Sequence, residues 1–67
     1  MPLNDALALF RRFGVNVECM TLRDFTISYF ILAKRYHPDH NPSAVQLMAN
    51  INAARTTILS SYRKSAA

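Results

Sequence analysis

The chain contains few of the residues that build loops and cross-links. Its 67 residues include one glycine, three prolines and one cysteine. Scarce glycine and proline argue against disorder and against a loop-rich disulfide scaffold. Because Cys19 is the only cysteine, neither an intrachain disulfide nor a cysteine-based zinc site is possible, and cysteine usage does not indicate secretion. We expect Cys19 to be a small, buried or half-buried apolar residue.

Long hydrophobic runs and acidic residues are scarce as well. The longest apolar run, 29–33, is far shorter than the roughly 18 residues that span a bilayer, so we expect no membrane segment. We expect a soluble, cytoplasmic protein, with an organellar matrix left open. The amphipathic first segment could mimic a transit peptide, but it carries Asp5 and lacks serine enrichment. The net charge of +4 suits an acidic partner surface, and would also suit nucleic acid.

What remains is a short chain of which 51% is hydrophobic. A chain of this length buries only about 60% of its unfolded surface, so its fold must be simple. The composition therefore predicts one compact, all-α domain over residues 1–67. We find no internal repeat, no low-complexity segment and no second domain.

Local signals predict three helices, near residues 5–13, 22–36 and 44–62. The first is expected to lie between Asn4 as its N-cap and Gly14 as its stop, with Asp5 favoured by the helix dipole. Ser43 is the expected N-cap of the third helix. Apolar residues recur at three- and four-residue steps in each segment, which predicts that one face of each helix enters the core.

The start of the second helix is the best-specified local feature. Thr21 and Asp24 form a capping box, in which each side chain accepts a backbone N–H of the other residue. Met20 and Phe25 match a hydrophobic staple across the same turn. The helix must end just before Pro38, which cannot continue it and disfavours helical geometry at the preceding residue.

The second helix has more apolar residues than one core face needs. Its periodicity, with that of the third helix, predicts a shared core of Tyr29, Leu32, Tyr36, Met48, Ile51 and Ile58. Ile27, Phe30 and Ile31 are then in excess. We expect at least two of these three to be exposed and to form an apolar interaction face for a partner protein, another copy, or another region of a longer chain.

The segment from Tyr29 to Leu59 resembles the J-domain family, which is named for the Hsp40 co-chaperones. The family pattern is a helix ending in A-Y-x-x-L-A-x-K-Y, then H-P-D, a loop rich in Lys, Asn and Pro, and a helix with I-N-x-A-x-x-x-L. The matching residues are Tyr29, Leu32, Ala33, Arg35, Tyr36, His37, Pro38, Asp39, Asn41, Pro42, Ile51, Asn52, Ala54 and Leu59. Phe13-Gly14-Val15 similarly resembles the Leu-Gly-Val that closes the family's first helix.

The resemblance implies a J-domain-like antiparallel helical hairpin with a short first helix packed alongside. It implies a module that binds an ATP-loaded Hsp70-type chaperone and stimulates its ATP hydrolysis, with no active site, cofactor or metal of its own. The residues implied in that contact are His37, Pro38, Asp39, Tyr29, Lys34, Arg35 and Arg23. The loop after Asp39 is short, as in the J domains of the mitochondrial import motor and auxilin.

The second helix departs from the family on its exposed face. Many members carry a row of lysines and arginines there, whereas this chain has Thr26, Ile27, Phe30 and Ile31. Arg23 and the pair at 34–35 are the basic residues that remain on this helix. Electrostatic steering would therefore contribute less to the rate of association with an acidic surface.

The chemistry of the tripeptide also suits recognition without any reference to the family. His37 would lie at a helix C-terminus, which favours a cation or a hydrogen-bond donor, and its charge is tunable near neutral pH. Pro38 restrains its neighbours, so His37 and Asp39 keep a defined geometry at low entropic cost. Asp39 offers a carboxylate for a bidentate arginine. The structural alternative is that His37 merely caps the helix and Asp39 ends a turn.

Other functions are weighed against this one. A metal site of His37, Asp39 and His40 has suitable ligand types, but three ligands crowded around a proline offer no obvious closed shell. No serine, cysteine or second carboxylate is placed to make an enzyme. A basic DNA-binding module would use Gln46, Asn50, Asn52, Arg55 and Thr56 on its last helix. A degenerate J-like scaffold would bind its partner without stimulating ATP hydrolysis.

Overall fold

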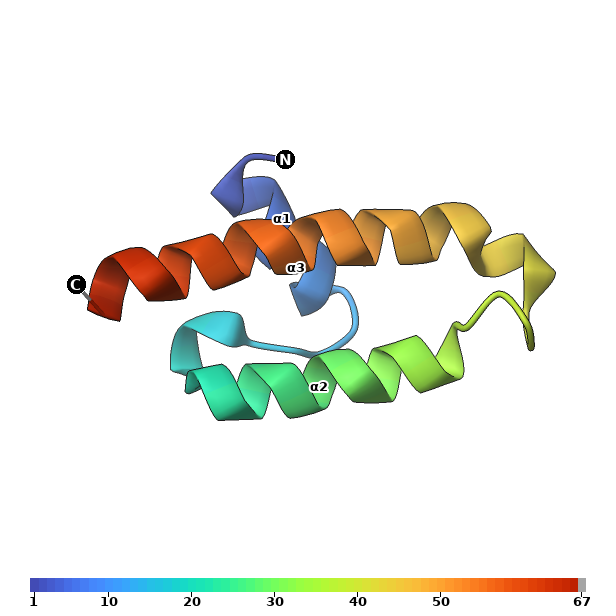
Figure 1. Cartoon of the computed structure of the whole chain (residues 1–67), viewed down its shortest axis with the longest axis horizontal. Helices are drawn as coiled ribbons and strands as arrows, with labels where there is room; N and C mark the ends of the chain where they lie inside the picture. The colour runs from blue at the N-terminus through green and yellow to red at the C-terminus, as the bar shows by residue number, and fades with distance from the viewer. Residues whose placement is uncertain (67) are drawn as a thin grey trace.

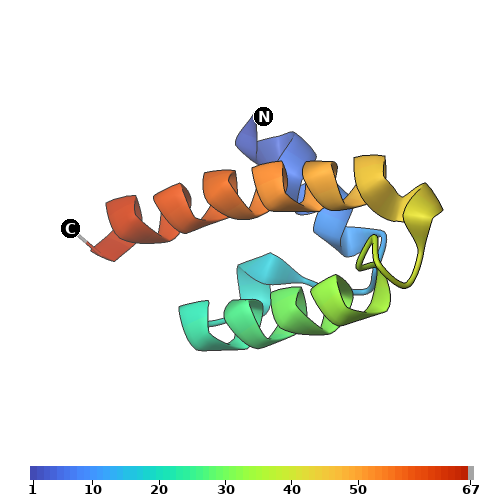
Figure 2. The same ribbon diagram turned by 45° about the vertical axis from the view of Figure 1, so that its right-hand side comes forward.

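The computed structural model describes residues 1–66 and is all-helical, as the composition predicts; no strand is present in this range. Its elements are α1 (Leu3–Arg11), the 3-10 helix η1 (Val17–Cys19), α2 (Leu22–Arg35), the 3-10 helix η2 (Pro42–Ala44) and α3 (Val45–Ala66). Figures 1 and 2 show α2 and α3 lying alongside each other in opposite directions, with α1 packed across α3. The connection between α2 and α3 lies at the opposite end of the molecule from the end of α3 (Figure 1).

Helix α1 begins and ends two residues earlier than predicted, and Gly14 has the predicted role of stopping it. Gly14 has a φ of 78°, in the left-handed region that favours glycine. The N–H groups of Gly14 and Val15 donate to the carbonyls of Arg11 and Phe10, which is the Schellman pattern for a helix end. The prediction that Asn4 caps the helix is wrong, because Pro2 occupies the N-cap and its carbonyl accepts the first backbone bond from Ala6.

Helix α2 begins at the predicted residue. The Thr21 hydroxyl oxygen accepts the Asp24 N–H at 3.2 Å, which is one half of the predicted capping box.

At the start of α3, the prediction that Ser43 is the N-cap is wrong. Ser43 lies inside η2 rather than at an N-cap, and its hydroxyl donates to Oδ1 of Asn41 at 2.7 Å. Asn41 therefore organises this turn, and α3 begins directly after η2 and continues past the predicted end at residue 62.

The core lies where the three helices meet. Its buried apolar residues are Ala6, Phe10, Val15, Val17, Phe25, Leu32, Ala44, Met48, Ile51, Ala54 and Ile58. Phe10 and Phe25 are fully buried and pack edge to face, with ring centroids 5.1 Å apart. Four of the six predicted shared-core residues are buried, while Tyr29 and Tyr36 are half-buried at its margin. A tyrosine suits this margin because its hydroxyl needs a polar partner.

The expectation for Cys19 is wrong, because its side chain is exposed. Cys19 belongs to η1, a single turn of three residues in which Val17 is the buried side chain. So short a turn directs only part of its surface to the core. The Cys19 sulfur accepts a hydrogen bond from Nδ2 of Asn16 at 3.4 Å.

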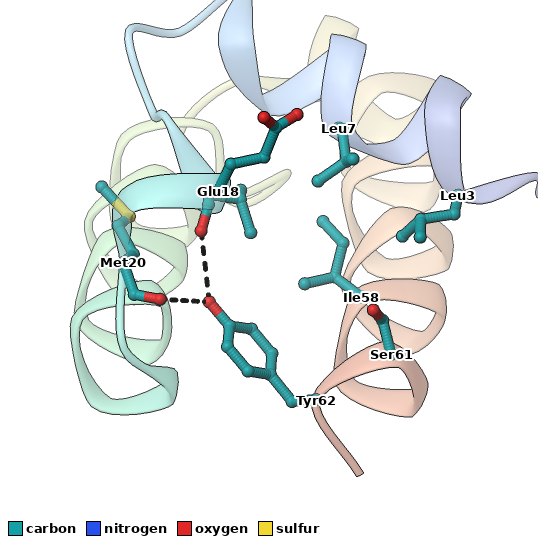
Figure 3. Close-up of a pocket in the computed structure, with 8 residues that line it drawn as sticks. Leu3, Leu7, Glu18, Met20, Ile58, Ser61 and Tyr62 are labelled. Atoms are coloured by element: carbon teal, nitrogen blue, oxygen red, sulfur yellow. Dashed lines mark hydrogen bonds between the residues drawn. The ribbon is translucent and has the colours of Figure 1, made fainter. Parts of the chain in front are cut away.

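Tyr62 ties the far part of α3 to the connection between α1 and α2. Its hydroxyl lies 2.8 Å from the Met20 carbonyl oxygen and 3.4 Å from that of Val17 (Figure 3). Its ring also packs against Phe25, with centroids 6.1 Å apart. Burial, and secondarily the Asp24 carboxylate, raise the pKa of Tyr62 above its ordinary value of 10.0.

Leu32→Ala tests the core face of α2. Leu32 is 5% exposed, so the substitution should lower the free energy of unfolding by about 2 to 5 kcal/mol through lost transfer energy and the cavity left behind. Urea unfolding followed by circular dichroism measures this. The matched control is Leu22→Ala on the same helix, where the side chain is 47% exposed and the expected loss is about 0.5 kcal/mol. Equal losses in the two variants would contradict the assigned face.

Tyr62→Phe tests the hydroxyl tie. At neutral pH the loss should be about 0.5 to 1.5 kcal/mol, the usual contribution of one hydrogen bond. Because the folded-state pKa of Tyr62 is raised, its contribution is present below the unfolded-state pKa and declines as the pH rises through the folded-state pKa. Unfolding measured from neutral to strongly alkaline pH should therefore show a steeper loss of stability for the unmodified chain than for Tyr62→Phe. Parallel pH profiles would contradict this account.

Candidate functional site

The sequence His37-Pro38-Asp39 lies in the connection between α2 and η2, directly after the last residues of α2. The side chains of His37 and Asp39 are 51% and 85% exposed, and Pro38 is half-buried. The connection forms one end of the molecule (Figure 1). The His37 imidazole and the Asp39 carboxylate, a hydrogen-bond donor and an acceptor, are therefore both exposed to solvent within three residues.

Backbone hydrogen bonds hold this loop in one shape. The His37 carbonyl accepts N–H groups from His40 at 3.0 Å and Asn41 at 2.9 Å, which closes a turn around the tripeptide. The Asn41 carbonyl then accepts the Ala44 N–H at 2.9 Å. These bonds link the end of α2 to η2 and limit the conformations open to the tripeptide, which preorganises it.

The side-chain hydrogen bond of His37 is formed with Asp39 in the loop and not with the end of α2. Its Nδ1 accepts the Asp39 N–H at 3.2 Å and lies 3.5 Å from Oδ2 of Asp39. The first contact requires neutral imidazole, whose proton is then on Nε2. The second becomes an ion pair when His37 is protonated. In both states Nε2 carries a hydrogen, so the loop presents a donor from His37 beside the acceptor carboxylate of Asp39.

Tyr29 is committed to the contact between α2 and α3. Its hydroxyl donates to Oδ1 of Asn52 at 2.6 Å, and the Arg55 guanidinium lies over its ring, 4.8 Å from the centroid. Nothing in the helical periodicity predicts this clamp, because its partners are 23 or more residues apart. Tyr29 therefore joins α2 to α3, and its contact with a partner stays a prediction.

The predicted basic residues on α2 are all exposed. Arg35 lies beside Tyr36, with its guanidinium 5.7 Å from the ring centroid. Tyr36 in turn packs against Phe13 with centroids 5.4 Å apart, which fixes the end of α2 against the connection that follows α1. The helix end that leads into the tripeptide is thus held by aromatic contacts.

The three apolar residues expected on the surface of α2 are exposed. Ile27 is 50%, Phe30 55% and Ile31 61% solvent-accessible. Their exposure confirms that they do not belong to the core. The partner that would cover them stays a prediction.

The alternative metal site of His37, Asp39 and His40 is not formed in the part of the chain that the structure describes. Among residues 1–66, no three His, Cys, Asp or Glu side chains are grouped so that they could hold a metal ion.

An apolar pocket of about 280 Å³ lies between α1, η1 and α3, beside Tyr62 and away from the tripeptide (Figure 3). Within residues 1–66, no helix is long and apolar enough to cross a membrane.

The polar residues weighed for DNA recognition are engaged within the domain. Gln46 donates to Oδ1 of Asn50 at 3.2 Å, and the Thr56 hydroxyl donates to the Asn52 carbonyl at 3.1 Å. Their side chains therefore already have partners on α3.

Comparisons of the chain with protein-family models, with curated proteins and with solved structures found no match.

The double substitution Ile27→Lys and Ile31→Lys tests the exposure of the apolar residues. Because both side chains are at least half exposed, the melting temperature should change little and solubility should increase. Thermal unfolding by circular dichroism measures the first effect. A collapse of the melting temperature would show that lysine charges have entered the core, where they cost several kcal/mol.

Proposed function

We propose that this chain is a J-domain-like co-chaperone module, which binds an ATP-loaded Hsp70-type chaperone and stimulates its ATP hydrolysis. The observation that carries the proposal is the position of His37-Pro38-Asp39, in an exposed and internally bonded turn directly after α2. The residues on either side resemble the family pattern from Tyr29 to Leu59. In this proposal α2 and α3 are the hairpin of the family and α1 is its short packed helix.

The proposed mechanism assigns recognition to this chain and chemistry to its partner. The imidazole N–H of His37 would donate to the chaperone, and the Asp39 carboxylate would accept a bidentate arginine. Because the turn is already closed by its own backbone bonds, little conformational entropy is lost on docking. Binding that favours the hydrolysis-competent state of the chaperone would raise its ATPase rate by shifting that equilibrium.

A second candidate is a J-like scaffold that binds its partner without stimulation. The observation that favours it is the exposed apolar trio at positions where the family has lysine or arginine. The two functions differ in one measurement, because a scaffold would bind the chaperone and leave its steady-state ATPase rate unchanged.

His37→Gln tests the co-chaperone function. The substitution should abolish stimulation of an Hsp70-type ATPase and leave the melting temperature unchanged, because the imidazole is exposed and its described bonds lie within the loop. Steady-state ATP hydrolysis with several Hsp70-type chaperones measures the activity. His40→Gln is the matched control, since His40 is an exposed histidine of the same turn outside the tripeptide, and it should retain stimulation.

Two results would contradict this assignment. If His37→Gln lowers the melting temperature and activity falls only in proportion, His37 has a structural role. If the unmodified chain stimulates none of the chaperones, the co-chaperone function is wrong.

A further inference from the structure

An apolar hollow and an apolar projection lie on separate parts of this small domain. The hollow is the pocket of about 280 Å³ between α1, η1 and α3. The projection is the surface of α2 that faces away from the core, on which Ile27, Phe30 and Ile31 are 50 to 61% exposed. The two features share no residue and belong to different elements. A projection and a hollow on one chain allow copies of that chain to join head to tail.

The projection has an aromatic ring at its centre. We call the surface of α2 opposite Phe25 its outer face, and it consists of the exposed residues Arg23, Ile27, Phe30, Ile31 and Lys34. Successive residues of a helix are about 100° apart, which places these five within an arc of about 100°. Ile27 lies three residues before Phe30 and Lys34 four residues after it, so both are neighbours of Phe30 on the helix surface. The outer face therefore presents a phenyl ring between an aliphatic side chain and an ammonium group.

The hollow has apolar walls and a carboxylate at its edge. Leu7 and Ile58 point into it from α1 and α3, and Glu18 of η1 lines its edge (Figure 3). An apolar cavity of about 150 Å³ is large enough to bind benzene. A hollow of about 280 Å³ therefore has room for the ring of Phe30 together with part of a neighbouring aliphatic side chain.

The charges of the two surfaces are opposite. In the part of the chain that the structure describes, Lys34 has no ion-pair partner. Glu18 is 62% exposed and pairs with Arg11 at 3.3 Å, an exposed contact of a kind that contributes little. A second carboxylate, that of Asp24, lies close to Tyr62, whose pKa is raised by burial and by this carboxylate. The negative charges at the pocket therefore suit an incoming ammonium group.

A symmetric contact between two outer faces fits the charges less well. An antiparallel pair of α2 helices that sets Ile27 of one copy against Phe30 of the other also sets Arg23 against Lys34. That arrangement places like charges together at both ends of the contact, which is destabilising. The contact between an outer face and a pocket has no such conflict.

We propose that copies of this chain associate head to tail, with Phe30 of one copy inserted into the pocket of the next and Lys34 of the first beside Glu18 of the second. This inference is independent of the proposed function, because it uses neither the tripeptide nor a chaperone. Each added copy brings an open pocket or an open outer face, so the assembly grows as the concentration rises. One side chain and its neighbours make a small contact, so association should be weak.

The experiment measures the average mass of the full chain by sedimentation equilibrium from about 10 µM to about 1 mM, the range that suits a weak contact. The mass should rise steadily and pass that of a dimer. Phe30→Ala should raise the dissociation constant about tenfold or more. The matched control is Leu22→Ala, which truncates a 47% exposed side chain of the same helix outside the outer face. It should change the dissociation constant less than about twofold.

Ser61→Trp tests the pocket, because Ser61 is a half-buried residue of its lining and an indole at this position fills the hollow. This variant should associate at least about tenfold more weakly. Ser60→Trp is the matched control, since Ser60 is exposed and outside this lining, and it should associate like the unmodified chain. Melting temperatures establish that each variant is folded. If Ser61→Trp is not folded, the exposed substitution Glu18→Lys tests the same side of the contact.

Mixing variants distinguishes a head-to-tail contact from a symmetric one. Phe30→Ala keeps an intact pocket and Ser61→Trp keeps an intact outer face, so an equimolar mixture should form a dimer and nothing larger. Glu18→Lys and Lys34→Glu should each weaken association a few-fold, and mixing the two should restore it, because the charges are then exchanged across one contact.

Four results would overturn the proposal. A monomer at every concentration excludes association, and full association of Ser61→Trp excludes the pocket. A mass that levels off at a dimer, with no restoration on mixing, would identify a symmetric contact between outer faces. A monomer that binds vesicles of phosphatidylserine and phosphatidylcholine, with binding lost in Phe30→Ala, would assign the outer face to a lipid surface.

Discussion

The contact between Phe10 and Phe25 is the interaction on which the arrangement of the helices depends. Both rings are fully buried and meet edge to face, one from α1 and one from α2. Ile51, Ala54 and Ile58 of α3 close the same cluster. Because a chain of this length has one small core, α2 and α3 share that core only through the side chains that α1 packs between them. Without α1, the two helices α2 and α3 would have little buried surface in common.

The tripeptide is positioned by this core through a chain of contacts. Gly14 turns the backbone after α1, and Phe13 then packs against Tyr36 at the end of α2. The bond from Tyr29 to Asn52 joins the middle of α2 to α3. The aromatic contact fixes the helix end that precedes the proposed recognition loop, and the loop's own backbone bonds close it while the His37 and Asp39 side chains stay exposed.

The sequence allowed good predictions where one residue dominates the local backbone. Thr21 and Pro38 define α2 to within one residue, and Gly14 ends α1, because cap geometry and the proline ring act locally. The caps assigned to Asn4 and Ser43 are wrong, because neighbouring Pro2 and Asn41 hold those positions. Local periodicity does not predict tertiary contacts such as those of Tyr29 with Asn52 and Arg55, because they depend on which segments meet. The exposure of Cys19 could not be predicted for the same reason.

Helix α3 has a geometric consequence that goes beyond packing. Its 22 residues form one uninterrupted helix that begins beside the tripeptide loop and ends at the other extremity of the molecule (Figure 1). At 1.5 Å per residue it is about 33 Å long. It thus behaves as a spacer: whatever is joined beyond α3 starts about 30 Å from the tripeptide. Under the proposed function, that length would set the distance between the chaperone at the loop and anything joined beyond α3.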